Sequence, residues 1–295
     1  MFSLSYIIAT RNRLPFLKIT LETLIGEVQP DEEIIVVDGN STDGAKEYLQ
    51  QLFDEGKINQ FISEPDYNQA HAWNKGFLMA NGCIIKKIID DDVYGMKAIR
   101  QCKNFMLSNP DIDICLSNVL VSNIVDFEKV EHKSDLMHFN IWKEGKINSF
   151  PFGDVHTLVR KSSLSFLGLY DTQLKMMDWE YSLRATFLKA KIAYYTGYNA
   201  LAAYTPGNVS STATKSELDF EGKIGKFKYK YTKSYYINFY SRIKIFAGKL
   251  LAKILEPPPA DHISVIPEQQ VLENIYLKYY KNLDDLFSDA DYFVY

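Results

Sequence analysis

The sequence predicts an α/β protein with a mostly parallel central sheet flanked by helices. In the first hundred residues, short apolar runs alternate with amphipathic segments, and this β-α-β rhythm is typical of a parallel sheet covered by helices. Each apolar run of this half ends in polar residues, and ligands of such sheets bind outside the carboxyl ends of the strands. The same pattern therefore predicts both the fold and the edge of the sheet at which a site lies.

The first half of the chain has the clearest elements. Strands are expected where apolar residues run together, and helices where apolar residues recur at helical spacing. The predicted strands are 4–10, 33–39, 58–63 and 83–89, and the predicted helices are 15–26, 42–53 and 69–81.

The second half is mixed and is expected to extend the sheet and to cover the site. Toward its end the composition shifts to lysine and tyrosine, and three consecutive prolines form a stiff break between the last two helices. The predicted elements are strands 113–121, 156–160 and 191–196, and helices 178–190, 234–255 and 268–287.

Length and composition indicate a globular protein with a sizeable core, because 46% of its 295 residues are hydrophobic. A net charge of -4 gives no general basic field, which argues against nucleic acid as a partner. The three cysteines form no C-x-x-C pair and are odd in number, which argues against a disulfide framework. No apolar run approaches the roughly 18 residues of a spanning helix. We therefore expect a cytoplasmic protein.

Four polar clusters follow the first four predicted strands and should share one edge of the sheet. For the second cluster two interpretations stay open. Asp38 and Asp43 either accept hydrogen bonds from a base or ribose, or belong to an ordinary turn in which Ser41 or Thr42 caps the next helix. The clusters are Thr10 to Asn12, Asp38 to Asp43, Glu64 with Asp66, and Asp90 to Asp92.

The fourth cluster consists of three consecutive aspartates, Asp90, Asp91 and Asp92, directly after an apolar strand. Adjacent carboxylates repel one another, and partial burial raises their pKa values unless a cation is present. Mg²⁺ commonly uses one or two carboxylates and takes its other ligands from phosphates and water. The triplet predicts a divalent cation site, with an exposed acidic turn as the alternative.

Two further segments carry candidate residues. In the helix 69–81, Lys75 is placed near the sheet edge, where it either balances phosphate charge or is simply solvated. In MMDWEYSLRATFLKA, Asp178 stands at a helix start. It is either an N-cap residue, favoured there by the helix dipole, or a general base in a cleft.

Together these segments resemble the family 2 glycosyltransferases, which have the glycosyltransferase A fold with a Rossmann-like sheet. The resemblance spans residues 3–212 and is greatest to the branch with DG-x-STDGT and SE-x-D followed by NKG. The motifs that carry it, in order, are SYIIATRNR, EIIVVDGNSTDGA, SEPDYNQAHAWNKGFLMANG, IIDDDVY, DWEYSLR and GNVSS.

The resemblance implies an inverting transfer of a sugar from a nucleoside-diphosphate donor, most often a UDP-sugar, assisted by Mg²⁺ or Mn²⁺. The expected acceptor is a glycan or a lipid-linked molecule, in cell-surface polysaccharide synthesis. Residues 1–105 would bind the nucleotide-sugar, residues 106–214 would bind the acceptor, and residues 215–295 would form a C-terminal helical extension.

Carried over by position, the family's roles fall on named residues of this chain. Donor binding would fall on Thr10, Arg11, Asp38, Asp66, Lys75 and Asp90, and the metal on Asp91 and Asp92. Asp178 would supply the catalytic base, and His156, Trp179 and Glu180 would lie near the acceptor.

The sequence also departs from the family pattern. Ile89 stands where an Asp or Asn usually precedes Asp91, so either Asp90 replaces that carboxylate or the first acidic position is lost. His71 stands where an Asp is frequent, and Asn68 replaces a common Gly.

Two rival functions stay open. A nucleotidyltransferase uses a similar sheet, but the loop ATRNRLP has no glycine where those enzymes carry a glycine-rich loop. A degenerate, non-catalytic partner subunit is the other rival. The basic and apolar helix 234–255 would lie on an anionic membrane surface at the inner face of the cell membrane, or pack on the catalytic domain or on a second copy of the chain.

Overall fold

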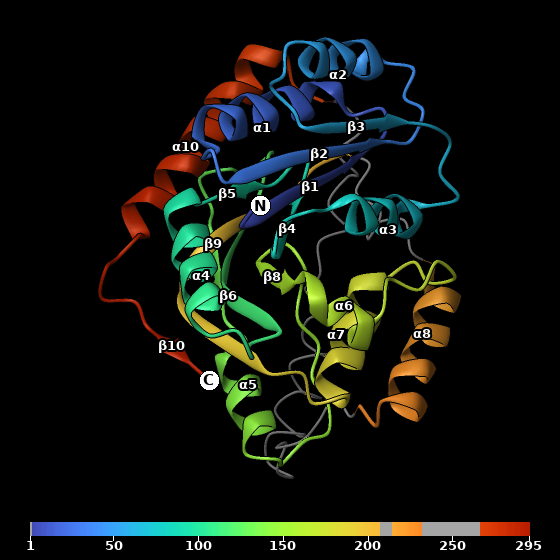
Figure 1. Cartoon of the computed structure of the whole chain (residues 1–295), viewed down its shortest axis with the longest axis vertical. Helices are drawn as coiled ribbons and strands as arrows, with labels where there is room; N and C mark the ends of the chain where they lie inside the picture. Colours follow the sequence, from blue (N-terminus) through green and yellow to red (C-terminus); the bar gives the residue numbers. More distant parts are fainter. Residues whose placement is uncertain (1, 207–213, 232–265) are drawn as a thin grey trace, which may run out of the picture.

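The computed structural model describes residues 2–206, 214–231 and 266–295. Within these ranges one ten-stranded sheet forms the centre of the protein, in the order β10-β9-β6-β8-β4-β1-β2-β3, with β5 paired to β9 and β7 to β6 (Figure 1). The strands are β1 Leu4–Thr10, β2 Glu32–Asp38, β3 Gln60–Ser63, β4 Ile84–Ile89, β5 Val93–Tyr94, β6 Ile114–Asn123, β7 Glu131–Lys133, β8 Thr157–Arg160, β9 Ile192–Tyr204 and β10 Phe293–Val294.

Helices cover both faces of the sheet, as the sequence predicts. The predicted helix 268–287 is confirmed, whereas the predicted helix 234–255 lies outside the described residues. The helices are α1 Leu14–Glu27, α2 Ala45–Asp54, α3 Gln69–Met79, α4 Met96–Ser108, α5 Leu136–Lys143, α6 Leu164–Leu167, α7 Met177–Phe187, α8 Lys215–Lys228 and α10 Gln269–Leu286, with a 3₁₀ turn at Lys161–Ser163.

The four N-terminal strands are parallel, which brings their polar ends to one edge. Thr10 pairs with Asp38, and Asp38 pairs with Ser63 across the next strand. On the other side of β1, Ala9 pairs with Ile89, the last residue of β4. The shared edge expected from the sequence is therefore confirmed. The second half adds the antiparallel strand β8 and the long parallel pair of β6 and β9.

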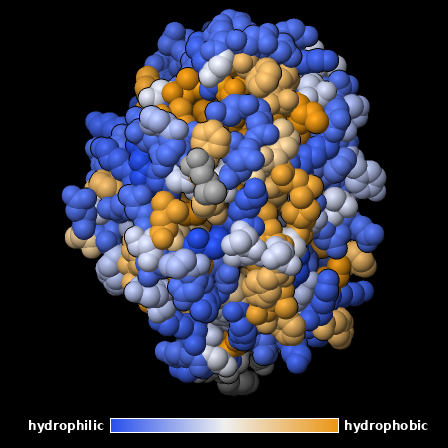
Figure 2. All heavy atoms as spheres, in the orientation of Figure 1, coloured by the Kyte–Doolittle hydropathy of each residue, from blue (hydrophilic) through white to orange (hydrophobic). Residues whose placement is uncertain are grey.

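Alternation along β1 divides the core between the two faces of the sheet. Tyr6 and Ile8 belong to the cluster packed under α1, α2 and α4, while Ile7 and Ala9 belong to the cluster under α3, α5 and α7. In the orientation of Figure 1, hydrophilic residues cover the end of the molecule over α2 (Figure 2). None of the helices in the described ranges has both the length and the apolar character needed to cross a membrane.

The turn before α2 differs from the expected one. The predicted capping by Ser41 or Thr42 is wrong, because α2 begins at Ala45 after Gly44, which has a φ of 92°. Asp43 instead accepts hydrogen bonds from the backbone N–H groups of Leu14 and Ala45, at 2.8 and 3.1 Å. One carboxylate thus links the starts of α1 and α2, an arrangement that a local capping rule does not anticipate.

Two glycines allow close approach between α3 and the sheet. A Cβ on Gly76 would lie 3.3 Å from the side chain of Ile7, which explains a glycine inside a helix despite its cost of about 1 kcal/mol. A Cβ on Gly82 would lie 2.6 Å from the backbone nitrogen of Ser5. The first strand and the α3–β4 turn therefore meet with no room for a side chain.

We expect Gly82→Ala to destabilise the protein by about 1–3 kcal/mol, because backbone atoms of β1 must move to admit the methyl group. The matched control is Gly26→Ala in α1, where nothing lies within 4 Å of the added Cβ. Gly26→Ala should be neutral or stabilising by up to about 1 kcal/mol. Urea denaturation measures both, and equal stability of the two variants would contradict the close packing described here.

Candidate functional site

Asp90, the first aspartate of the triplet, is buried and fully engaged with β1 and α1. Its carboxylate accepts hydrogen bonds from Thr10 Oγ1 at 2.7 Å and from Arg13 Nε at 2.9 Å. Its backbone carbonyl accepts one from Thr20 at 2.8 Å. Asp90 therefore anchors the end of β4 to the first strand and helix.

Asp91 is held by three distant segments of the chain. Its carboxylate accepts hydrogen bonds from Arg13 Nη2, at 2.6 Å, and from the hydroxyl of Thr205. Arg13 also donates to the carbonyl of Pro206 at 2.8 Å. From α10, the hydroxyl of Tyr276 donates to the backbone carbonyl of Asp91. The C-terminal helix thus directly contacts the acidic loop, which consists of Asp90, Asp91 and Asp92.

Asp92 completes the acidic loop and is fixed by β9, because the backbone N–H of Ala203 donates to its carboxylate at 2.8 Å. Burial and the neighbouring Asp91 raise the pKa of Asp92 well above its ordinary value. Burial likewise raises the pKa of Asp90 to about 6, although Arg13 acts against the shift. For Asp90, one arginine therefore offsets only part of the effect of burial.

Two adjoining cavities meet at the acidic loop and share Gln69, Ile89 and Asp91. The cavity lined by Thr10, called the Thr10 cavity, has a volume of about 300 Å³. The cavity lined by Asp178, called the Asp178 cavity, has a volume of about 240 Å³. Besides the shared Gln69 and Asp91, the polar side chains of the Thr10 cavity are Thr10, Arg11, Arg13, Asp66, Asn68 and Asp90. Charged side chains of the Asp178 cavity, besides Asp91, are Lys87, Asp92, Asp154, Lys175 and Asp178.

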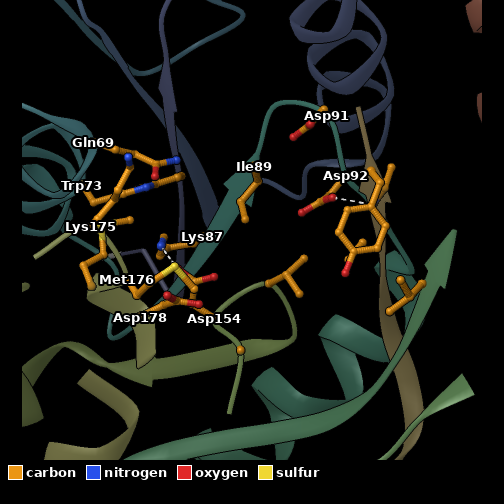
Figure 3. A pocket seen from close by; sticks show the side chains of 17 residues that line it. Gln69, Trp73, Lys87, Ile89, Asp91, Asp92, Asp154, Lys175, Met176 and Asp178 are labelled. Carbon is orange, nitrogen blue, oxygen red and sulfur yellow. Dashed lines mark hydrogen bonds and ion pairs between the residues drawn. The ribbon is translucent and has the colours of Figure 1, made fainter. Parts of the chain in front are cut away.

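Asp178 lies in the first turn of α7, across the Asp178 cavity from the acidic loop. Figure 3 shows Asp91 and Asp92 on one side and Lys87, Asp154 and Asp178 gathered on the other. The N-cap interpretation of Asp178 is wrong, because the helix begins at Met177 and has no side-chain cap hydrogen bond. Burial, reinforced by Asp154 and opposed by Lys87, raises the pKa of Asp178 to about 6. A carboxylate with this pKa suits proton transfer near neutral pH.

The predicted donor-binding residues fall into two groups. Thr10, Arg11, Asp66 and Asp90 line the Thr10 cavity. Lys75 supports this cavity from α3 through ion pairs with Asp66, at 2.6 Å, and Glu64, at 2.9 Å.

Asp38 lies at the same edge but is fully buried, and its carboxylate accepts hydrogen bonds from Ser41 and from Ser63, the latter at 2.6 Å. These contacts place Asp38 in the turn after β2, although Ser41 does not cap α2, and they orient the loop that leads to Asp43.

The three residues predicted near the acceptor have other surroundings. His156 is buried, and burial together with Lys86 lowers its pKa to about 3, so its ring is neutral at physiological pH. Trp179 packs edge-on against Tyr231, with ring centroids 5.8 Å apart.

Glu180 is buried in a network that joins α7 to the segment after α8. Its carboxylate binds Arg184, four residues further along α7, at 3.0 Å and accepts a hydrogen bond from the hydroxyl of Tyr229. These contacts account for the burial of Glu180 without a ligand.

Sequence reasoning did not identify several residues of the site. The signal for Lys87 is visible, because a lysine in the middle of an apolar strand requires partners. The others come from segments far away in sequence, where no local pattern marks them. The residues are Arg13, Lys87, Asp154, Thr205 and Tyr276.

The residues present fit a divalent cation held jointly with a phosphate ligand. Within the described part of the chain, no three acidic, histidine or cysteine side chains are arranged to hold a metal by themselves. Asp91 and Asp92 line one cavity together, and two carboxylates are the usual protein share of a Mg²⁺ site completed by phosphates and water.

Two solved glycosyltransferases are similar in fold to this chain, and the shared fold is the glycosyltransferase A fold. Residues 1–349 of S. aureus TarS in complex with UDP-GlcNAc give a TM-score of 0.55 at 17% identity, covering 97% of this chain and 74% of that one. Mannosyltransferase PcManGT from Pyrobaculum calidifontis, in complex with GDP-Man and Mn²⁺, gives 0.52 at 15% identity, covering 93% and 69%.

The glycosyl transferase family 2 model matches residues 5–168, more than half of the chain, so this protein belongs to glycosyl transferase family 2. The resemblance described from the motifs is thereby confirmed. An uncharacterised glycosyltransferase of Nostoc sp. is 30% identical over 93 residues, which span 31% of this chain and 29% of that relative.

We expect Tyr276→Phe to destabilise the protein by about 0.5–1.5 kcal/mol and to speed hydrogen exchange of the amides at 90–95, because the Asp91 carbonyl loses its donor. The control is Tyr48→Phe, since the buried hydroxyl of Tyr48 has no hydrogen-bond partner among the described residues. Exchange rates at 90–95 that are the same in both variants would show that α10 does not restrain the acidic loop.

Proposed function

We propose that this family 2 glycosyltransferase is inverting and metal-dependent, and that it moves a sugar from a nucleoside-diphosphate donor to a hydroxyl group of a glycan or lipid-linked acceptor. A UDP-sugar is the proposed donor, and the synthesis of a cell-surface polysaccharide the proposed process. The neighbouring structures support the donor class and the cation, since one contains UDP-GlcNAc and another GDP-Man with Mn²⁺.

The proposal rests on the placement of carboxylates around the two cavities. Asp91 borders both cavities, so a ligand there can reach the Thr10 cavity and the Asp178 cavity together. Asp178 lies at the far side of the second cavity (Figure 3). A base on one side and a site for the diphosphate on the other is the arrangement that an in-line displacement with inversion requires.

In the proposed reaction Asp178 accepts the proton of the acceptor hydroxyl. The oxygen of that hydroxyl then forms a bond to the anomeric carbon, and the bond from this carbon to the diphosphate oxygen breaks. The nucleoside diphosphate leaves with the electron pair, and no covalent intermediate with the enzyme is needed. With a pKa of about 6, Asp178 is mostly ionised at pH 7 and still basic enough to act.

The Thr10 cavity binds the donor in this proposal. Arg11 places positive charge where the diphosphate would lie, and Asp66, positioned by Lys75, offers an acceptor for the base or ribose. A divalent cation held by Asp91 and Asp92 would supply neutralisation of the charge that grows on the leaving diphosphate. Residues 1–105 thus form the donor half and 106–214 the acceptor half.

We expect Asp91→Ala and Asp178→Ala each to lower the transfer rate by at least about 100-fold, because one loses the diphosphate site and the other the base. The assay measures product from UDP-, GDP- and dTDP-sugars with and without Mn²⁺ or Mg²⁺, and proton NMR of the product gives its anomeric configuration. The control is Asp54→Ala on the exposed surface of α2, which should retain full activity.

The outcomes separate the parts of the proposal. Full activity of Asp178→Ala would remove Asp178 as the base, and a product with the donor's anomeric configuration would overturn inversion. Activity that survives complete removal of divalent cations would overturn the metal dependence. Release of pyrophosphate from a nucleoside triphosphate would replace the proposal with a nucleotidyltransferase.

A further inference from the structure

Lys87 is a lysine in the interior of the sheet whose role the proposed reaction leaves open. It stands between Ile85 and Ile89 on the same face of β4, and its side chain is only 5% exposed. A buried ammonium group costs free energy unless it is paired and hydrogen-bonded. The burial of Lys87 therefore calls for an explanation from its surroundings.

Those surroundings form a cage around the ammonium group. Lys87 Nζ makes an ion pair with Asp154 and lies 3.2 Å from the hydroxyl of Tyr170. The rings of Trp73 and Tyr170 lie 4.1 and 4.6 Å from it, in the geometry of cation-π contacts. The Tyr170 hydroxyl also donates to Asp154 at 3.4 Å. Partners on α3 and on two loops thus fix the position of this charge.

The cage adjoins Asp178. Lys87, Asp154, Tyr170 and Asp178 together line a narrow cavity behind the Asp178 cavity. Burial raises the pKa of Asp178 most, Asp154 raises it further, and Lys87 lowers it. The charged and titratable groups around Asp178 on every packed element are Lys87 of β4, Asp154 before β8, Tyr170 and Lys175 before α7, Tyr181 of α7, Tyr204 of β9, and Asp91 and Asp92 of the acidic loop.

We propose that the Lys87–Asp154 ion pair is a positioning device for Asp178, in which Lys87 supplies the counter-charge that keeps the base ionised and Asp154 holds Lys87 back from pairing directly with it. The inference rests on the proposed role of Asp178 as general base. Lys87 and Asp154 are accordingly positioning residues, which act on the reaction through Asp178.

Both members of the pair are needed for an effective base. Without Lys87, a carboxylate next to Asp154 in a largely buried cavity would take up a proton near neutral pH and could no longer accept one from the acceptor. Without Asp154, Lys87 would be released to pair with Asp178, which would then stay ionised but become a weaker base. The two losses therefore change the acidity of Asp178 in opposite directions, which a purely structural role does not predict.

The test follows the acidic limb of the pH profile of kcat/KM in the full-length enzyme. In the unchanged protein the midpoint of this limb should lie at about pH 6, which is the pKa of Asp178, and kcat/KM should fall as the pH drops below it. Lys87→Met should move the limb to higher pH by about one unit or more, and Asp154→Asn should move it to lower pH. The double variant should lie between the two.

Lys103→Met is the matched control, because Lys103 is another buried lysine, which pairs with Glu32 at 2.8 Å and lines neither cavity around Asp178. The control should leave the acidic limb in place. A shift equal to that of Lys87→Met would mean that the loss of any buried lysine has the effect, and would overturn the proposal.

A second measurement keeps the proposal separate from the proposed function. Carbon-13 NMR of labelled aspartate carboxyls, with Asp178 assigned from the signal missing in Asp178→Asn, follows the pKa of Asp178 without any turnover. Shifts in opposite directions in folded Lys87→Met and Asp154→Asn confirm the charge coupling. Shifts in the same direction, or none, refute it even if Asp178 proves to be the base. If Asp178→Asn retains full activity, the role of Asp178 as base fails instead.

Discussion

The contact between Arg13 and the acidic loop is the interaction on which the site depends. Asp90 and Asp91 are both almost completely buried, and both accept hydrogen bonds from this one guanidinium. Asp91 takes a further one from Thr205, so the start of α1, the end of β4 and the segment after β9 converge on two carboxylates. A planar guanidinium with several donors suits this task better than an ammonium would, because it can bind two carboxylates at fixed angles.

The family model matches residues 5–168, but this convergence shows that the site also depends on residues outside that region. Ala203, Thr205 and Tyr276 all contact the triplet, and the last belongs to the C-terminal helix α10. That helix packs against β9 and β5, next to the acidic loop (Figure 1). The helix α10 is therefore part of the support for the site rather than an appendage to it.

The sequence predicted most of the first half of the fold and its site edge, because both depend on local patterns. Apolar runs and helical spacing mark strands and helices, and parallel order alone brings Thr10, Asp38 and Asp90 to one edge. Local sequence patterns could not predict the partners of the acidic residues. The pairing of Lys87 with Asp154 joins positions 67 residues apart, and that of Tyr276 with Asp91 joins positions 185 apart. Only the packed structure specifies contacts of this kind, and short elements such as β5 and β10 depend on it too.

The turn after β4 bears on the carboxylate that is missing at Ile89. The strand ends at Ile89, and the chain then turns, because the backbone N–H of Asp92 donates to the carbonyl of Ile89 at 3.2 Å. Ile89 and Asp91 line both cavities, whereas Asp90 lines only the Thr10 cavity and its carboxylate is already bound by Thr10 and Arg13. Asp90 is therefore not placed to substitute for a carboxylate at Ile89. Asp92, which lines the Asp178 cavity with Asp91, is the better-placed partner for a cation shared with a diphosphate.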